Sequence, residues 1–235
     1  MIWLKRKKLQ LISVLLVFLG CSNNPDRVSI IYLFDTSGSF HTDALPYCID
    51  LSEKIFEEMT DPNGSFQVFP QIHQVSSIDE SSVEIGIQCS EEVEQPNLFS
   101  PSKEEASLED CLTQVRKSKR ASYTDLKGAL YNASQALQFK NAFKAIIVFS
   151  DLHENVPKQK VYTYDLNGVS VFVIHEVSNE QRADPQLIEK DKKSFVNILL
   201  EKGVKKNDIE IKSLKTIGQD PTEVVNFLRQ SFFDK

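Results

Sequence analysis

The 235-residue sequence predicts an α/β fold: a doubly wound, mostly parallel sheet with one antiparallel edge strand and helices on both faces. Two observations predict this class. Residues 28–34 and 143–149 are near-continuously apolar, which is typical of strands buried on both faces. Segments whose apolar residues have helical spacing lie between the apolar runs, and this alternation indicates a parallel sheet covered on both sides.

Each predicted element follows from a local pattern. In residues 41–59 the apolar side chains fall on one helical stripe, where Pro46 fits only within the first turn. Residues 66–72 and 83–87 resemble strands, and we expect them to form the antiparallel edge pair. A second clear amphipathic helix spans 126–137. The other predicted elements are a helix at 108–115, strands at 143–149 and 169–175, a helix at 185–202 that Gly203 ends, a strand at 209–214 and a helix at 221–233.

The N-terminal residues are predicted to be an export signal and not part of the fold. Basic residues at 5–8 precede an apolar run at 9–19, which ends at Gly20-Cys21. An eleven-residue run covers only about half of a ~30 Å hydrocarbon core at ~1.5 Å per residue. We therefore do not expect this run to form a membrane-spanning helix.

Residues 16–21 resemble the lipobox of bacterial lipoproteins, which implies that Cys21 is lipidated and becomes the mature N-terminus. The predicted organisation is a lipoprotein signal peptide at 1–20, a lipidated tether at 21–27 and one domain at 28–235. The protein would then be lipid-anchored in the bacterial cell envelope. Ser22 lacks the acidic character linked to inner-membrane retention, so we prefer the outer membrane for a Gram-negative cell. The alternative is an ordinary cleaved signal followed by an incidental cysteine.

The charge balance argues against a nucleic-acid partner. Four of the 27 Lys and Arg residues lie in the predicted signal peptide, so the mature chain has 23 against 33 Asp and Glu, a net charge of −10. Neutralising phosphates requires a basic surface, and an exported acidic protein is poorly suited to it.

The segment Asp35-Thr36-Ser37-Gly38-Ser39 follows the first predicted strand and has two incompatible interpretations. An aspartic protease needs a second Asp-Thr-Gly or Asp-Ser-Gly turn, so that two carboxylates share a proton. It also needs an all-β scaffold, or a homodimer that supplies the second turn. The sequence has no second turn of this kind, and its helical periods contradict an all-β fold. The protease is therefore the disfavoured interpretation.

The second interpretation is a metal-binding loop. Asp35 ends the first strand and Asp151 follows the strand at 143–149, so both carboxylates are expected at the carboxyl edge of the sheet, where ligands bind in such folds. Ser37, Ser39 and Thr124 add hydroxyl oxygens. Hard cations such as Mg²⁺ prefer oxygen ligands of these kinds.

Three stretches resemble the motifs of the von Willebrand factor type A domain, in the order and spacing of that family. Residues 30–39 resemble its first motif, an apolar strand followed by D-x-S-x-S. Residues 124–130 resemble the second, a threonine that opens a helix, and residues 146–151 resemble the third, an apolar strand ending in Ser/Thr-Asp. The chain departs from the pattern where the family often has glycine: residues 121–123 are Ala-Ser-Tyr, and Leu152 follows the last aspartate.

The resemblance implies a metal-ion-dependent adhesion site. Ser37, Ser39 and Thr124 would be direct ligands of Mg²⁺, or of Mn²⁺ or Ca²⁺. Asp35 and Asp151 would act mainly through bound waters or hydrogen bonds to the hydroxyls. The remaining coordination position would accept an acidic side chain of a partner protein.

We therefore expect a membrane-anchored, exported protein-binding module and not an enzyme. The alternatives are a structural or scaffold protein of the same fold with a vestigial metal site, and a metal-assisted hydrolase with His153 as its base. A nitrogen- or sulfur-based metal site is disfavoured, because no H-x-x-x-H or C-x-x-C spacing occurs. Cys48 falls on an apolar helical stripe, which leaves Cys89 and Cys111 as a possible disulfide in an oxidising compartment; Cys48 is the alternative partner.

Overall fold

The computed structural model describes residues 26–38, 40, 44–60, 66–75, 77–79, 82–83, 108–118, 120–138, 142–157 and 161–233. The predicted signal peptide at 1–20, the lipidation site Cys21, the predicted ligand Ser39 and the predicted disulfide partner Cys89 lie outside these ranges. Predictions that concern those residues stay predictions.

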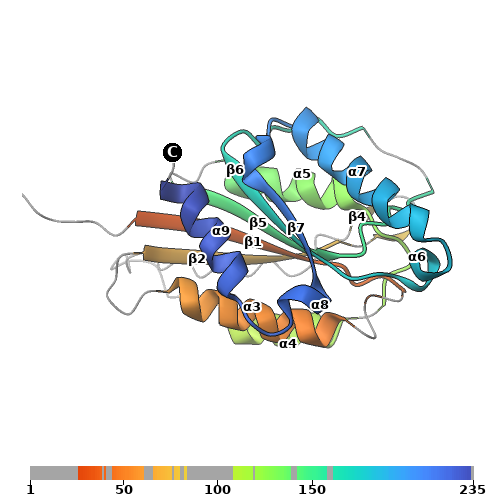
Figure 1. Ribbon diagram of the computed structural model, residues 1–235, viewed down its shortest axis with the longest axis horizontal. Helices are drawn as coiled ribbons and strands as arrows, with labels where there is room; N and C mark the ends of the chain where they lie inside the picture. The colour runs from red at the N-terminus through yellow and green to blue at the C-terminus, as the bar shows by residue number, and fades with distance from the viewer. Residues whose placement is uncertain are drawn as a thin grey trace, which may run out of the picture.

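The fold is built on a five-stranded parallel sheet with the order β2-β1-β5-β6-β7 (Figure 1). Its strands are β1 (Asp26–Phe34), β2 (Phe66–Gln74), β5 (Phe143–Ser150), β6 (Val169–His175) and β7 (Ile209–Ser213). The chain passes from β1 to β2 on one side and returns to β5 on the other, so the strand order reverses at β1. This doubly wound arrangement confirms the predicted α/β class and places the topological switch between β1 and β5.

The predicted antiparallel edge pair is not confirmed. Strand β2 lies at the edge of the sheet and pairs in parallel with β1 from Asp26 opposite Phe66 to Phe34 opposite Gln74. A long helical connection separates β1 from β2, and such a crossover returns the chain in the same direction. The antiparallel pairing within the described residues joins β3 (Ser77–Asp79) to β4 (Ser82–Val83) as a separate small ribbon. Residues 84–87 lie outside the described ranges.

Helices cover both faces of the sheet, as Figure 1 shows. Alternate side chains of β1 point to opposite faces, so Tyr32 packs under one helical layer and Leu33 under the other. The first layer contains α3 (Leu45–Met59), α4 (Leu108–Arg116), α8 (Leu214–Ile217) and α9 (Thr222–Phe233). The second contains α5 (Leu126–Leu137) and α7 (Pro185–Glu201). The short helix α6 (Asn179–Ala183) precedes α7, and the 3₁₀ turn η1 (Lys206–Asp208) precedes β7.

Local sequence explains where the helices begin. Helix α3 starts at Leu45 with Pro46 in its first turn, the position at which proline leaves no intrahelical hydrogen bond unmade. Asp125 caps α5, its side chain accepting a hydrogen bond from the Gly128 N–H at 2.7 Å. Asp184 caps α7 in the same way, and Pro185 follows it. None of the helices in the described ranges is long and apolar enough to span a membrane.

A stack of aromatic rings lies beneath the carboxyl ends of β1 and β5. The rings of Phe34 and Phe149 stack with centroids 4.7 Å apart, and Tyr32 stacks beside both. All of these side chains are fully buried. Burying one large apolar side chain contributes about 2–3 kcal/mol, so this aromatic group holds the two strand ends firmly against each other.

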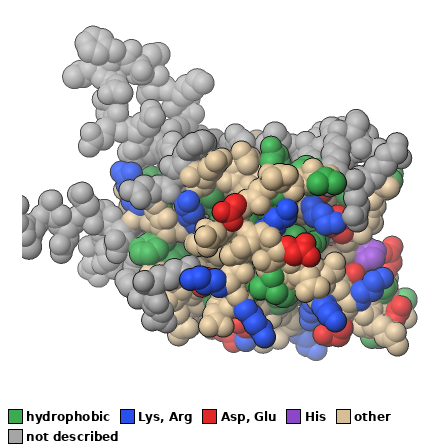
Figure 2. All heavy atoms as spheres, turned by 90° about the horizontal axis from the view of Figure 1, so that it is seen from above, with side chains coloured by type: hydrophobic (Ala, Val, Ile, Leu, Met, Phe, Trp, Pro, Cys, Tyr) green, Lys and Arg blue, Asp and Glu red, His purple; other side chains and the backbone are tan. Residues whose placement is uncertain are grey.

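Charges of both signs are mixed on the face shown in Figure 2. Figure 2, which looks onto the side of α5 and α7, shows Lys and Arg side chains interspersed with Asp and Glu. Among the described cysteines, Cys48 is a buried free thiol, whereas Cys111 is disulfide-bonded. The bonding partner of Cys111 lies outside the described ranges, so its pairing with Cys89 stays a prediction.

Candidate metal centre

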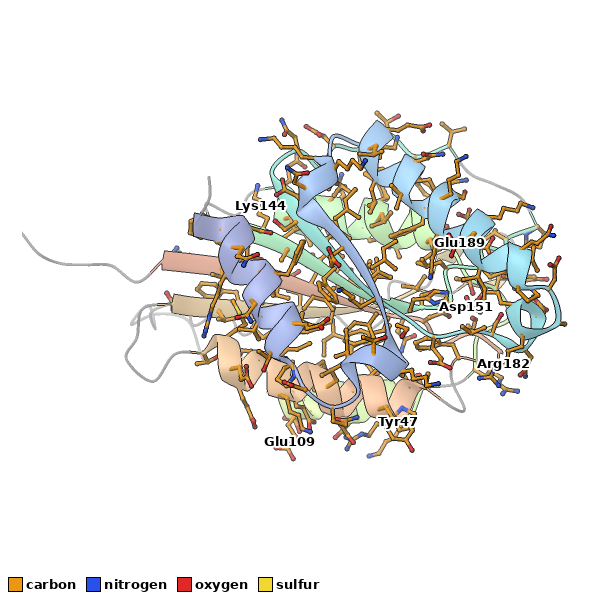
Figure 3. All side chains as sticks on the ribbon, viewed as in Figure 1. Tyr47, Glu109, Lys144, Asp151, Arg182 and Glu189 are labelled. Carbon is orange, nitrogen blue, oxygen red and sulfur yellow. The ribbon has the colours of Figure 1, made fainter. Side chains whose placement is uncertain are left out.

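The topology places Asp35 and Asp151 at the same edge of the sheet. Asp35 follows β1 and Asp151 follows β5, and these strands are neighbours with Phe34 opposite Phe149. The pairing continues past the strand end, because the Asp35 N–H donates to the carbonyl of Phe149 at 2.9 Å. Figure 3 shows Asp151 at one end of the sheet and Lys144, near the start of β5, at the opposite end. The carboxyl ends of adjacent parallel strands therefore bring the two carboxylates together.

Both carboxylate oxygens of Asp35 are held by hydrogen bonds. The Ser37 N–H donates to Oδ1 at 2.8 Å, and the Ser150 hydroxyl donates to Oδ2 at 2.7 Å. The side chain is fully buried. With both oxygens engaged, Asp35 is arranged to orient its neighbours and supply negative charge, not to offer a free ligand.

Two hydroxyls from distant parts of the chain meet beside this carboxylate. The Thr124 Oγ1 donates to the Ser37 Oγ at 2.7 Å, and both side chains are buried. The loop that carries Thr124 is held next to the first loop by the Ala121 N–H, which donates to the Thr36 carbonyl at 2.9 Å. The Ala-Ser-Tyr sequence at 121–123, where the family often has glycine, is therefore compatible with close approach of the two loops.

The two buried carboxylates raise each other's energy when both are charged. Burial, and then the charge of Asp151, raise the pKa of Asp35 to about 7, although hydrogen bonds from Ser37 and Ser150 oppose the shift. Burial also raises the pKa of Asp151, against hydrogen bonds from His153 and Ser178. A cation bound between such groups would relieve both the desolvation and the repulsion.

Leu152 occupies a left-handed backbone conformation, with φ of 61°. This region costs a leucine roughly 1–2 kcal/mol, because its Cβ crowds the following carbonyl oxygen. The side chain is only 2% exposed and packs into the core layer of α5 and α7. The backbone conformation explains why glycine suits this position, and side-chain burial offsets the strain of having leucine there.

His153 lies in a polar cluster beside the carboxylates. Its Nδ1 is 3.0 Å from Asp191 Oδ2, and its Nε2 is 3.4 Å from Glu180 Oε2. The Gln181 amide donates to the carbonyl of Asp151 at 2.8 Å and to Asp191 at 3.0 Å. This cluster braces the loop after β5 against α6 and α7. Within the described ranges, no group of three or more His, Cys, Asp or Glu side chains is arranged to hold a metal ion.

The structure brings together four of the five predicted ligands: Asp35, Ser37, Thr124 and Asp151. The fifth, Ser39, lies outside the described residues. Ser150 belongs to this group as well. The sequence contained a signal for it, because the third motif ends in Ser/Thr-Asp. Gln181 and Asp191 were not predicted, because α6 and α7 are distant in sequence and no local pattern places them at this edge.

The arrangement fits a small, hard cation. Cis ligands of an octahedral ion at ~2.1 Å are about 3 Å apart. The Ser37 and Thr124 hydroxyl oxygens are 2.7 Å apart. A small increase in this distance would let both oxygens contact one ion. The side chains of Ser37, Thr124, Asp35 and Asp151 offer oxygen atoms, which suit Mg²⁺ or Mn²⁺ better than a soft metal.

No protein-family model matches the chain, and no curated protein matches its sequence. Solved structures similar to it include a von Willebrand factor type A protein from Catenulispora acidiphila, at 12% identity and a TM-score of 0.45 over 88% of this chain and 42% of that one. The ArnB paralog VWA2 from Sulfolobus acidocaldarius has 16% identity and a TM-score of 0.43, over 88% of this chain and 46% of its own. The manganese-loaded TRAP protein of Plasmodium vivax has 13% identity and a TM-score of 0.42, over 89% of this chain and 74% of its own.

The chain spans less than half the length of the first two of these structures. All of these similarities are distant in both sequence and superposition, and they transfer no function to this chain. The α/β class follows instead from the sheet order, the parallel pairing and the helices on both faces.

Proposed function

We propose that the chain is a von Willebrand type A-like module that binds a divalent metal ion and captures a carboxylate of a partner protein. The observation that carries the proposal is the meeting of the Ser37 and Thr124 hydroxyls beside two buried carboxylates, Asp35 and Asp151. Residues from three separate loops converge at one point on the carboxyl edge of the sheet. No requirement of the core accounts for burying two repelling carboxylates at this edge.

Each residue has a distinct part in this proposal. Ser37 and Thr124 would contact the ion directly, joined by Ser39. Asp35 would hold the Ser37 loop in position and, with Asp151, balance the charge of the cation. The ion would supply a Lewis-acidic position for the partner's carboxylate. We expect no catalysis, because binding alone accounts for this set of groups.

A vestigial site is the second candidate function, and a specific observation favours it. The Thr124 hydroxyl donates to the Ser37 hydroxyl, and each carboxylate oxygen of Asp35 accepts a hydrogen bond from the protein itself. A protein with this fold would then serve as a structural or scaffold module. The two functions differ in whether the site binds metal.

A Mn²⁺ titration of the purified full chain, followed by electron paramagnetic resonance, separates the two functions. Saturable binding that Asp35→Ala and Asp151→Ala abolish supports the adhesion site. Thr124→Ala should retain weak binding, because it removes a neutral ligand only. His153→Ala is the comparison variant and should weaken binding much less than either aspartate variant. Absence of saturable binding, with all variants folded, would leave the scaffold function. Binding lost in His153→Ala but kept in Asp151→Ala would move the site to the histidine cluster.

The proposed location is the bacterial cell envelope, with a lipid anchor at Cys21. This part rests on the lipobox-like sequence alone. Cys21→Ala should release the protein from membranes or leave it as the unprocessed precursor. Equal membrane binding and an identical N-terminus in the variant and the wild type would rule the anchor out.

A further inference from the structure

Thr124 must point its hydroxyl at Ser37, yet the loop that carries it is not held by helix geometry. Helix α5 begins only at Leu126. Before Thr124 in the chain, the hydrogen bond from the Ala121 N–H to the Thr36 carbonyl fixes the start of the loop. The peptide groups of Thr124 itself lie between these anchors, so a further contact is needed to set the direction of its side chain.

Asn155 makes that contact with hydrogen bonds in both directions. The Thr124 N–H donates to the Asn155 side-chain oxygen Oδ1 at 2.7 Å. In return, the Asn155 N–H donates to the Thr124 carbonyl at 3.4 Å. The side chain and the backbone of one asparagine therefore engage the peptide groups on both sides of the Thr124 Cα.

We propose that Asn155 is a positioning residue for the metal centre, which holds the Thr124 hydroxyl toward Ser37 before any ion binds. Asn155 lies in the loop that follows Asp151, so it also couples the position of Thr124 to that of Asp151. The inference rests on the proposed metal-binding function. It concerns a residue that contacts neither the ion nor the partner carboxylate.

The neighbouring contacts explain why this role falls to Asn155. Asp125 uses one oxygen to cap α5 through Gly128 and accepts a hydrogen bond from the Tyr162 hydroxyl on the other, at 3.1 Å. The Tyr162 ring stacks on Tyr131 with centroids 5.3 Å apart, which fixes this tyrosine against α5. These contacts immobilise the start of α5 but do not hold the Thr124 peptide groups, which hydrogen-bond to Asn155 instead.

The size of the effect follows from the hydrogen bond. A neutral hydrogen bond contributes a net ~1 kcal/mol, and ~1.4 kcal/mol is a factor of ten in affinity. Without the acceptor, Thr124 would sample orientations that do not bind the ion, and each productive encounter would have to reorder it. We expect Asn155→Ala to weaken Mn²⁺ binding by about fivefold to tenfold. The side chain is exposed, so its truncation leaves no cavity in the core.

The test uses the full chain and two measurements. Hydrogen exchange of the Thr124 amide, followed at single-residue resolution without metal, reports the Asn155 contact directly. Mn²⁺ titration reports its consequence for the site. Asn155→Asp keeps an acceptor oxygen in the same place, and Asn207→Ala is a control, an exposed asparagine in η1 at the other end of the sheet.

In Asn155→Ala, the Thr124 amide should exchange at least tenfold faster and Mn²⁺ affinity should fall as above. In Asn155→Asp, the Thr124 amide exchange rate should stay close to that of the wild type, and the Mn²⁺ affinity should be equal to that of the wild type or higher. Asn207→Ala should change neither the exchange rate nor the affinity. Unchanged exchange in Asn155→Ala, or faster exchange with unchanged Mn²⁺ affinity, would overturn the inference. A wild-type chain that binds no Mn²⁺ would instead refute the proposed function, whereas the exchange result would still report on the contact.

Discussion

The carboxyl edge of the sheet differs sharply from the core directly beneath it. In the core, the apolar rings of Phe34 and Phe149 stack on each other and are fully buried. One residue further along the chain, Asp35 and Ser150 are just as buried, but they bring a charge and a hydroxyl into the interior. At this edge the carboxylates repel each other and Leu152 has a left-handed backbone.

The costs at this edge are supported by the core beneath it. Strain and buried charge cost stability, and they persist only where the surrounding structure over-determines the conformation. Here the aromatic stack and the parallel pairing of β1 with β5 supply that support. The core is thus arranged for stability, whereas the proposed binding function belongs to the edge above it.

The largest effect is expected from breaking the supporting core. Phe149→Ala removes a fully buried ring from the stack and should lower the free energy of unfolding by about 3–5 kcal/mol. Chemical denaturation monitored by circular dichroism measures this loss. Tyr47→Ala is the control, because that ring is 57% exposed and its removal should change stability by less than ~0.5 kcal/mol. Similar losses in the two variants would contradict the view that the core supports the edge.

The second effect concerns the repulsion at the edge and depends on pH. The folded-state pKa of Asp35, about 7, lies above its usual value of 3.8. Protonation therefore stabilises the metal-free protein at pH below about 4, and this contribution is lost as pH rises through about 7. Asp35→Asn mimics the protonated form, so it should be more stable than the metal-free wild type at pH 8 by about 2–4 kcal/mol and equal to it at pH 4.

Thermal unfolding of both proteins in EDTA, from pH 4 to pH 8, measures this difference. Mn²⁺ should restore stability to the wild type at pH 8 and leave Asp35→Asn unchanged. A metal-free wild type that becomes more stable between pH 5 and pH 8, relative to the variant, would contradict the assignment of a raised pKa to Asp35.

The smallest effect tests the strained backbone at Leu152. Glycine is normally less stable than alanine by about 0.5–1 kcal/mol at an ordered position, because it gains more entropy on unfolding. At a φ of 61° the order should reverse, with Leu152→Gly more stable than Leu152→Ala by about 1 kcal/mol. Both variants should be less stable than the wild type, since each removes a buried side chain. Finding Leu152→Ala the more stable of the two, by the same denaturation assay, would show that the backbone is not strained there.

The two regions also differ in how far the sequence predicted them. The apolar runs at 28–34 and 143–149 and the helical spacing at 126–137 correspond to β1, β5 and α5, because burial on both faces and amphipathic periodicity are local patterns. Asp35, Ser37, Thr124 and Asp151 were identified by motif, and the parallel topology explains why they meet. The pairing of β2 differed from expectation, because a strand's direction depends on its connection and not on its composition.

The contacts that brace the edge had no local signal. Asn155 engages Thr124 across 31 residues, and Gln181 reaches the Asp151 carbonyl across 30. Asparagine and glutamine at loop and helix positions are common, and only the folded chain shows which peptide group each one meets. Leu152 was noted as a departure from the family pattern, but its positive φ and its buried side chain required the structure.

A crystal structure of the protein grown with Mn²⁺, with the ion located by its anomalous scattering, would show directly whether the carboxyl edge of the sheet binds metal. We expect an anomalous peak at about 2.1–2.2 Å from both the Ser37 Oγ and the Thr124 Oγ1, with Asp35 and Asp151 around it. A well-ordered edge with no peak at saturating Mn²⁺, or a peak beside His153 and Asp191 instead, would contradict this expectation.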